Sequence, residues 1–226
     1  WQLDVEGDGS RVRIKSHRVK DNEDYDTDPD TDGTQADVTW TEQTKVSEEA
    51  PVVIELRGDT SSTEDIFEVK TYTKAFNDLS SKMKSHAFQL DVAGNQNQIR
   101  IKSYRVRNNE DYDTDPITED IQPDITWTEQ IKIPGDASVV RELLRAGEAA
   151  DGDAVDVKTY TKAFNDRNSH VKAHAIQLDV DGDGDLIRIK SIRLKTDGSD
   201  AADATYSEQI RQPDQAGLLH KRTVMR

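Results

Sequence analysis

The 226-residue chain has no cysteine, which excludes disulfide bonds, thiolate nucleophiles and zinc sites with cysteine ligands. No apolar run approaches the roughly 20 residues that a membrane-spanning helix needs. No signal peptide is recognisable, and the chain opens with Trp1, which indicates a processed or cut N-terminus. We therefore expect no membrane span, and a mature chain that is secreted or exposed at the cell surface.

Basic residues are outnumbered, because 30 Lys and Arg stand against 45 Asp and Glu and leave a net charge of −15. Such a charge disfavours binding to phosphate backbones, so we expect no nucleic-acid partner. The five histidines form no His-x-His or His-Glu-x-x-His pattern, and no P-loop, Rossmann glycine pattern or Gly-x-Ser-x-Gly occurs. We expect that the protein is not an enzyme.

The sequence contains an internal repeat. The block Trp-Gln-Leu-Asp-Val at residues 1–5 recurs, with its first residue changed, at 88–92 and 176–180. The block Arg-Ile-Lys-Ser at 13–16 keeps the same spacing, as does Trp-Thr-Glu-Gln at 40–43. This spacing predicts three repeat units, the last one partial: 1–87, 88–175 and 176–226. The boundaries shift if residues 66–87 and 154–175 belong to the unit that follows each.

Apolar residues alternate with polar ones within a unit, a pattern typical of β-strands. Residues 1–5 and 11–15 flank a Gly-Asp-Gly turn and predict a hairpin, in which Asp4 pairs with Arg13 or Lys15 across the strands. Further strands are expected from Val38, Phe67 and their repeats. The fold class predicted is mainly β, with tandem repeated β-sandwich or barrel-like domains of about 88 residues, each with one short helix.

The helices are expected at 136–147, capped by Asp136 or Ser138, and at 51–58, where Pro51 suits a first turn. The tract 77–86 has few apolar residues and is interpreted as a connection. In the last unit, residues 213–219 match the helix segment, and no strand like 157–164 is expected after them. The first unit starts without that strand as well, so we expect an open sheet edge to which another copy of the chain can add a strand.

Two acidic segments share the sequence Asn-Glu-Asp-Tyr-Asp-Thr-Asp-Pro, at 22–29 and 109–116. Carboxylates this dense repel one another unless water screens them or a cation binds among them. Calcium takes six to eight oxygen ligands, which a curled acidic loop can supply. We therefore predict a calcium site with these ligands: Asp24, Asp26, Asp28, Asp111, Asp113 and Asp115. The alternative is a solvated acidic loop that keeps the protein soluble.

The stretch from Asp179 to Asp185 resembles the first half of an EF-hand calcium loop. The resemblance ends there, because Lys190 stands where a bidentate Glu belongs and the following residues alternate as in a strand. A hairpin turn is the favoured interpretation. A metal site here would use Asp179, Asp181, Asp183 and Asp185.

The sequence thus predicts a calcium-binding extracellular structural or adhesive tandem-repeat protein. Divalent cations are the expected partners, together with other copies of the chain or a glycan, and self-assembly by strand addition would give multimers or fibres. One alternative is a carbohydrate-binding lectin whose rings stack on sugars, with Tyr25, Tyr112, Trp40 and Trp127 as candidates. A second alternative is an extracellular polysaccharide hydrolase, which should show a single deep pocket.

Overall fold

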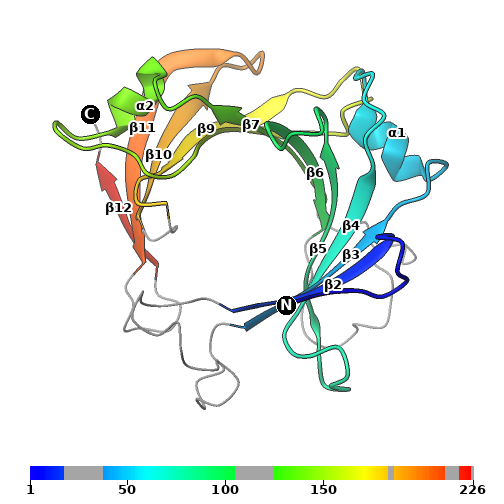
Figure 1. Cartoon of the computed structure of the whole chain (residues 1–226). Helices are drawn as coiled ribbons and strands as arrows, with labels where there is room; N and C mark the ends of the chain where they lie inside the picture. The colour runs from blue at the N-terminus through cyan, green and yellow to red at the C-terminus, as the bar shows by residue number, and fades with distance from the viewer. Residues whose placement is uncertain (18–37, 105–124, 183–185, 212–218, 225–226) are drawn as a thin grey trace. The chain divides into compact units, whose positions relative to one another are not determined.

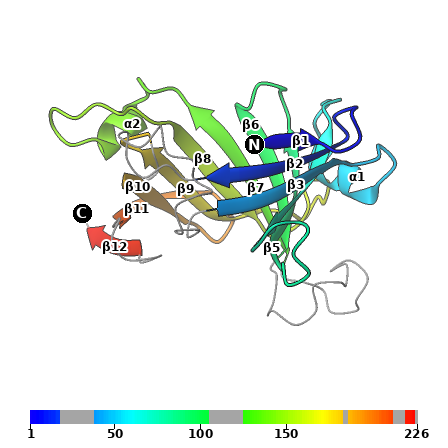
Figure 2. The same cartoon turned by 60° about the horizontal axis from the view of Figure 1, so that its bottom comes forward.

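The computed structural model describes residues 1–17, 38–104, 125–182, 186–211 and 219–224, and these form mainly β structure (Figures 1 and 2). All strands belong to one antiparallel sheet, in which their order follows the sequence from β1 to β12. The strands are β1 (Gln2–Asp4), β2 (Arg11–His17), β3 (Val38–Lys45), β4 (Ile66–Tyr72), β5 (Met83–Asp91), β6 (Gln98–Tyr104), β7 (Ile125–Ile133), β8 (Ala154–Tyr160), β9 (Val171–Asp179), β10 (Leu186–Leu194), β11 (Asp200–Arg211) and β12 (Leu219–Val224). The predicted β class is confirmed.

The chain divides into two compact units. The first comprises residues 1–53, 65–90 and 102–125, and the second comprises 54–64, 91–101 and 126–226. The division into three 88-residue units stays a prediction. Neither of the described helices is long and apolar enough to cross a membrane.

The predicted hairpin of the first unit is formed by β1 and β2, with Leu3 opposite Arg13 and Asp4 opposite Val12. The expected pairing of Asp4 with Arg13 or Lys15 is wrong. Side chains alternate between the two faces of a strand, so a register that places Leu3 opposite Arg13 puts Asp4 on the other face. Asp4 instead accepts hydrogen bonds from the backbone N–H groups of Gly7 and Gly9, at 2.9 and 2.8 Å, and closes the turn.

The strands expected from Val38 and Phe67 are β3 and β4, and β5 pairs with β4. The tract 77–86 is only partly a connection, because β5 already begins at Met83. The polar composition of the tract did not indicate a strand. His86 is nevertheless 1% exposed, because its imidazole is bonded to Glu68 of β4. A buried, hydrogen-bonded histidine therefore occupies a core position here.

In the second unit β7 to β12 follow one another as antiparallel neighbours, and β9, β10 and β11 lie side by side in both views (Figures 1 and 2). Its core packs α2 (Ser138–Leu143) on the sheet. Val140 and Leu143 face Ile176 and Leu178, and Val140 and Leu178 are 0% exposed. Burial of such side chains contributes about 1.5–3 kcal/mol each.

Both short helices were predicted, and α1 spans Pro51–Arg57. The predicted caps of α2 are wrong, because its N-cap is Ala137, whose side chain makes no capping hydrogen bond. Gly58 and Gly147, at the expected helix ends, have positive φ of 56° and 85°. Such angles favour glycine. Gly58 directly follows α1 and ends it in this conformation. The predicted end of the second helix at Gly147 is wrong, because α2 already ends at Leu143.

The end of the chain also differs from expectation. Residues 219–224 form β12, which pairs with β11 and places Val224 opposite Tyr206. This matches β3 with β4, where Trp40 is opposite Tyr72. The strand predicted to be missing from the third repeat is therefore present. Leu219, the last residue of the expected helix segment 213–219, belongs to this strand, and residues 212–218 lie outside the described residues.

Candidate functional site

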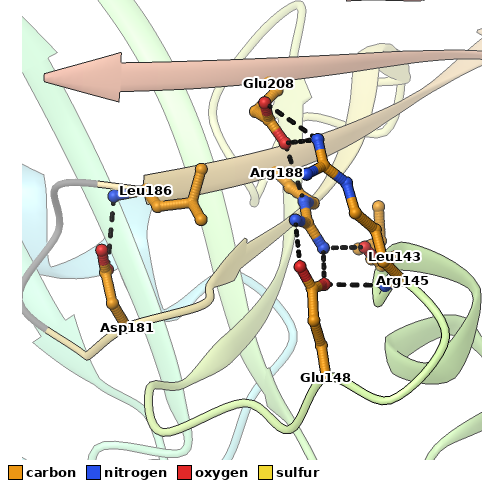
Figure 3. Close-up of polar contacts among 7 residues, drawn as sticks. All are labelled: Leu143, Arg145, Glu148, Asp181, Leu186, Arg188 and Glu208. Carbon is orange, nitrogen blue, oxygen red and sulfur yellow. Dashed lines mark hydrogen bonds and ion pairs between the residues drawn. The ribbon is translucent and has the colours of Figure 1, made fainter.

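A cluster of ion pairs surrounds Arg188 of β10, which is 6% exposed (Figure 3). Its Nε donates to Glu208 of β11 at 3.0 Å. Its Nη1 donates to the backbone carbonyl of Leu143, at the end of α2, at 3.0 Å. Both Nη atoms contact the Glu148 carboxylate, Nη2 at 3.0 Å. Arg145 donates to Glu208 as well, at 3.0 Å, so two cations and two carboxylates alternate around the cluster.

The electrostatics of the cluster stabilise the charged forms of Glu148 and Arg188. The hydrogen bond from Arg188, with one from the backbone N–H of Arg145, lowers the pKa of Glu148 to about 2. The same hydrogen bond, which the Glu148 carboxylate accepts, raises the pKa of Arg188. The guanidinium also satisfies a carbonyl that the end of a helix leaves without an intrahelical partner. Arg188 therefore ties α2 to the sheet.

Arg100 repeats this arrangement one repeat earlier and is 8% exposed. Its Nε donates to Glu129 at 2.9 Å, and its Nη1 donates to the carbonyls of Leu56 and Arg57 at 3.2 and 2.7 Å. The guanidinium lies 4.4 Å from the centroid of the Phe164 ring, within cation–π range. Arg100 thus joins the end of α1, a strand glutamate and an aromatic ring.

Arg13 holds the equivalent position in the first unit. Its Nε donates to Glu42 at 2.7 Å, and its guanidinium lies 4.6 Å from the Phe76 ring centroid. Partial burial acts to raise the pKa of Glu42, but hydrogen bonds from Arg13 and Arg11 outweigh it and lower that pKa. The Arg13 side chain is 33% exposed, against 9% for Arg100 and 7% for Arg188, so the same pair is more hydrated here. We call the three pairs, Arg13–Glu42, Arg100–Glu129 and Arg188–Glu208, the arginine staples.

Two histidines at equivalent positions of the repeat, His86 and His174, are buried and bonded to carboxylates. His174 bonds Asp156 through Nε2 and Asp200 through Nδ1, both at 2.8 Å. His174 is 7% exposed, so its imidazole is buried between these two carboxylates. His86 bonds Glu68 at 2.7 Å through Nε2, while its Nδ1 has no partner among the described residues. Both histidines are buried, His86 at 1% and His174 at 7% exposed.

The predicted metal ligands are only partly described. The acidic segments with Asp24, Asp26, Asp28, Asp111, Asp113 and Asp115 lie outside the described residues, as do Asp183 and Asp185. Asp179 accepts a hydrogen bond from the backbone N–H of Gly182 at 3.0 Å. Asp181 accepts one from the backbone N–H of Leu186 at 3.2 Å, which Figure 3 shows. These two carboxylates therefore close the β9–β10 turn. Within the described part of the chain, no three His, Asp or Glu side chains are grouped as a metal site requires.

The tryptophans considered for sugar stacking lie in aromatic packing. Trp127 is 6% exposed and contacts Phe164 edge to face at 6.1 Å between centroids. Trp40 makes the equivalent contact with Phe76 at 5.9 Å and is half-buried. Trp127 therefore presents no free face to a sugar. The remaining candidates, Tyr25 and Tyr112, lie outside the described residues, and the lectin interpretation stays a prediction for them.

A cavity of about 530 Å³ opens in the second unit beside α2, the end of β7 and the start of β8. Ile131, Val140 and Leu178 are among its apolar lining residues. Lys132 and Asp153, which also line it, form an ion pair at 2.7 Å. Glycoside hydrolysis ordinarily uses two carboxyl groups across the scissile bond, and Asp153 is the carboxylate of this lining. This cavity therefore does not offer the pair of carboxyl groups that a glycoside hydrolase ordinarily uses. The hydrolase interpretation stays a prediction.

The glutamates of the arginine staples were the residues that sequence reasoning missed. Glu42, Glu129 and Glu208 stand at the third position of the repeated block that begins with Trp or Tyr. That recurrence was visible in the sequence, and so was the recurrence of Arg13 in the Arg-Ile-Lys-Ser block. Their pairing depends on the register of β2 with β3, which places Arg13 directly opposite Glu42.

Comparison with known proteins gives no relative for this chain: no family model matches it, and neither does any curated protein or solved structure.

Proposed function

We propose that the protein is a structural or adhesive repeat protein, built from modules of about 88 residues, whose acidic segments bind calcium. The observation that carries the proposal is the recurrence of the arginine staple at three equivalent positions. Each staple joins neighbouring strands, and in the second unit Arg100 and Arg188 also hold the end of a helix. Ion pairs that recur at equivalent positions stabilise each repeat, and this supports a structural role.

The place of the acidic segments in the chain supports a role beyond folding. They lie between β2 and β3 and between β6 and β7. At the equivalent place in the third repeat, β10 and β11 are joined directly by a turn, where Lys195 N–H donates to the carbonyl of Ser199 at 2.8 Å. The strand pairing thus forms without such a segment. Long, ligand-rich connections that a fold does not need are common sites of function.

Calorimetric titration with calcium tests this proposal. We expect heat of binding at millimolar calcium or below, and a rise in melting temperature, because a ligand bound to the native state stabilises it by mass action. Replacing Asp24, Asp26 and Asp28 with Asn, together with Asp111, Asp113 and Asp115, should remove both signals.

A matched control replaces three exposed acids elsewhere, Glu6, Glu49 and Asp136, with their amides. This control should retain calcium binding. If the unaltered protein shows neither heat nor a melting shift, or if the control loses them equally, the calcium proposal is wrong. Asp179→Asn with Asp181→Asn tests the β9–β10 turn separately, and we expect this variant to retain the signals.

A further inference from the structure

The cavity beside α2 lies where one position of the repeat carries a smaller residue than its counterpart. Three buried residues of its lining are Val140, Ala154 and Leu178. The same positions of the preceding repeat carry residues that are also buried, which are Val53, Ile66 and Leu90. Ala154 and Ile66 are equivalent because each lies opposite the leucine of the next strand. Valine and leucine are thus kept between the repeats, and isoleucine is replaced by alanine.

The alanine leaves space that its neighbours do not fill. A smaller buried side chain leaves a cavity because the surrounding structure relaxes only partly. Ile131 and Ile133 also line this cavity. Both are larger than the residues at these positions of the preceding repeat, Thr44 and Val46. A volume of about 530 Å³ nevertheless remains, so these isoleucines form apolar walls around it.

Two glycines complete the lining. A Cβ on Gly152 would lie 2.5 Å from the carbonyl oxygen of Asp179, so the backbone there leaves no room for a side chain. A Cβ on Gly135 would meet nothing within 4 Å, and Gly135 is exposed. The cavity therefore has a fixed backbone wall at Gly152 and an opening to solvent at Gly135.

The charges of the lining are already paired. Its charged residues are Lys132 and Asp153, which contact each other at 2.7 Å. The preceding repeat has the equivalent pair, Lys45 with Asp65, also at 2.7 Å, so this pair belongs to the repeat. A charged ligand would leave water without a free partner of opposite charge, which is costly. The lining therefore favours an uncharged ligand.

A polar side chain suited to an uncharged ligand is that of Gln98, which also lines the cavity. Its Nε2 donates to Glu129 at 2.9 Å, and this hydrogen bond holds the amide in place. An amide has a second N–H and a carbonyl oxygen, either of which can bond a hydroxyl group. Ligand pockets typically combine apolar walls with a few such groups in about 300–1,000 Å³.

We propose that this cavity binds a small uncharged alcohol, aliphatic or aromatic. Its apolar body contacts Ile131, Val140 and Leu178, and its hydroxyl group bonds the amide of Gln98. Apolar cavities of about 150 Å³ already bind benzene, so the larger volume here has room for an apolar body with a hydroxyl group. The site lies within the second unit and goes beyond the proposed structural role, on which it does not depend.

Binding of N-phenylnaphthylamine tests the cavity, because this uncharged aromatic amine becomes more fluorescent in apolar surroundings. The full chain is titrated into a fixed amount of the probe in the presence of a calcium chelator, and n-octanol is then added. We expect saturable binding with one site per chain and displacement of the probe by n-octanol. Octanoate and octylammonium should displace it about tenfold less effectively or worse, because each would bury an unpaired charge.

The repeat itself supplies the variant that closes the cavity. Ala154→Ile introduces the residue of the preceding repeat and should raise the dissociation constant of the probe about tenfold or more. Ala154→Val is a smaller change that should weaken binding less, and it serves as the test if the isoleucine variant does not fold. The matched control is Ala173→Ile, which adds the same side chain at an exposed position outside the lining and should bind as the unaltered protein does.

A further variant tests the polar contact. Gln98→Met removes the amide at similar length and should weaken displacement by n-octanol about threefold or more. The proposal is overturned if the unaltered protein shows no saturable binding, or if both Ala154 variants bind as well as the control. It is also overturned if octanoate or octylammonium displaces the probe as well as n-octanol, or if Gln98→Met leaves displacement by n-octanol unchanged.

Discussion

At the scale of single residues, buried polar side chains serve the fold because they have hydrogen-bond partners. Arg188 meets two carboxylates and a helix carbonyl, and His174 meets two carboxylates. An ion taken out of water without such partners costs several kcal/mol. These sites therefore make stability sensitive to any substitution that leaves one charge alone.

The first prediction concerns acid stability and Glu148. Its pKa falls from 4.5 when unfolded to about 2 when folded. A lowered folded-state pKa contributes stability that is fully present above about pH 4.5 and is lost as the pH falls through about 2. In Glu148→Gln this contribution is absent, so the stability difference between the unaltered protein and the variant should shrink over this window. Urea unfolding at a series of pH values measures it, and a difference that grows toward low pH would contradict the account.

The second prediction compares the two carboxylates of His174. The Asp156 side chain is 22% exposed and that of Asp200 is 53% exposed. Asp156→Asn removes the better-buried carboxylate bonded to the buried His174 imidazole and should cost roughly 1–3 kcal/mol in unfolding free energy. Asp200→Asn should cost less, because water can replace an exposed partner. Chemical denaturation of both variants decides this, and an equal or reversed order would argue against Asp156 as the principal partner of His174.

At the scale of elements, much of the fold could be predicted from alternation and turn residues. The β1–β2 hairpin, both helices and the strands from Val38 and Phe67 follow from local patterns. The start of β5 did not, because His86 is a core residue only through its bond to Glu68 on another strand. The arginine staples were missed for the same reason: they depend on register between strands about 30 residues apart.

The third prediction concerns the glycines that follow the two helices in the chain. Gly58 and Gly147 both have positive φ, so Gly→Ala strains the backbone by roughly 1–2 kcal/mol at each. At Gly58 an added Cβ would also lie 2.8 Å from the Cβ of Phe164, whereas nothing lies within 4 Å at Gly147. Gly58→Ala should therefore lower the melting temperature more than Gly147→Ala. Equal shifts would show that the packing of Phe164 on this turn does not matter.

At the scale of the whole molecule, repetition is the clearest feature of the sequence, and the structure shows which contacts recur with it. Equivalent positions carry equivalent partners, as in Arg100–Glu129 and Arg188–Glu208. They differ in burial, since Arg13 has no described helix end to hold and remains one-third exposed. The acidic segments stand apart from this scheme, and the third repeat pairs its strands without one.

The most direct test of the scaffold account is a pair of double-mutant cycles on equivalent staples. Arg100→Met with Glu129→Gln should give a coupling energy of roughly 1.5 kcal/mol or more, because both side chains are about nine-tenths buried. Arg13→Met with Glu42→Gln should give less than about 1 kcal/mol, because Arg13 is hydrated. Couplings in this order support staples that stabilise neighbouring strands by burial of the ion pair. Equal couplings, or a value near zero for Arg100–Glu129, would contradict the account.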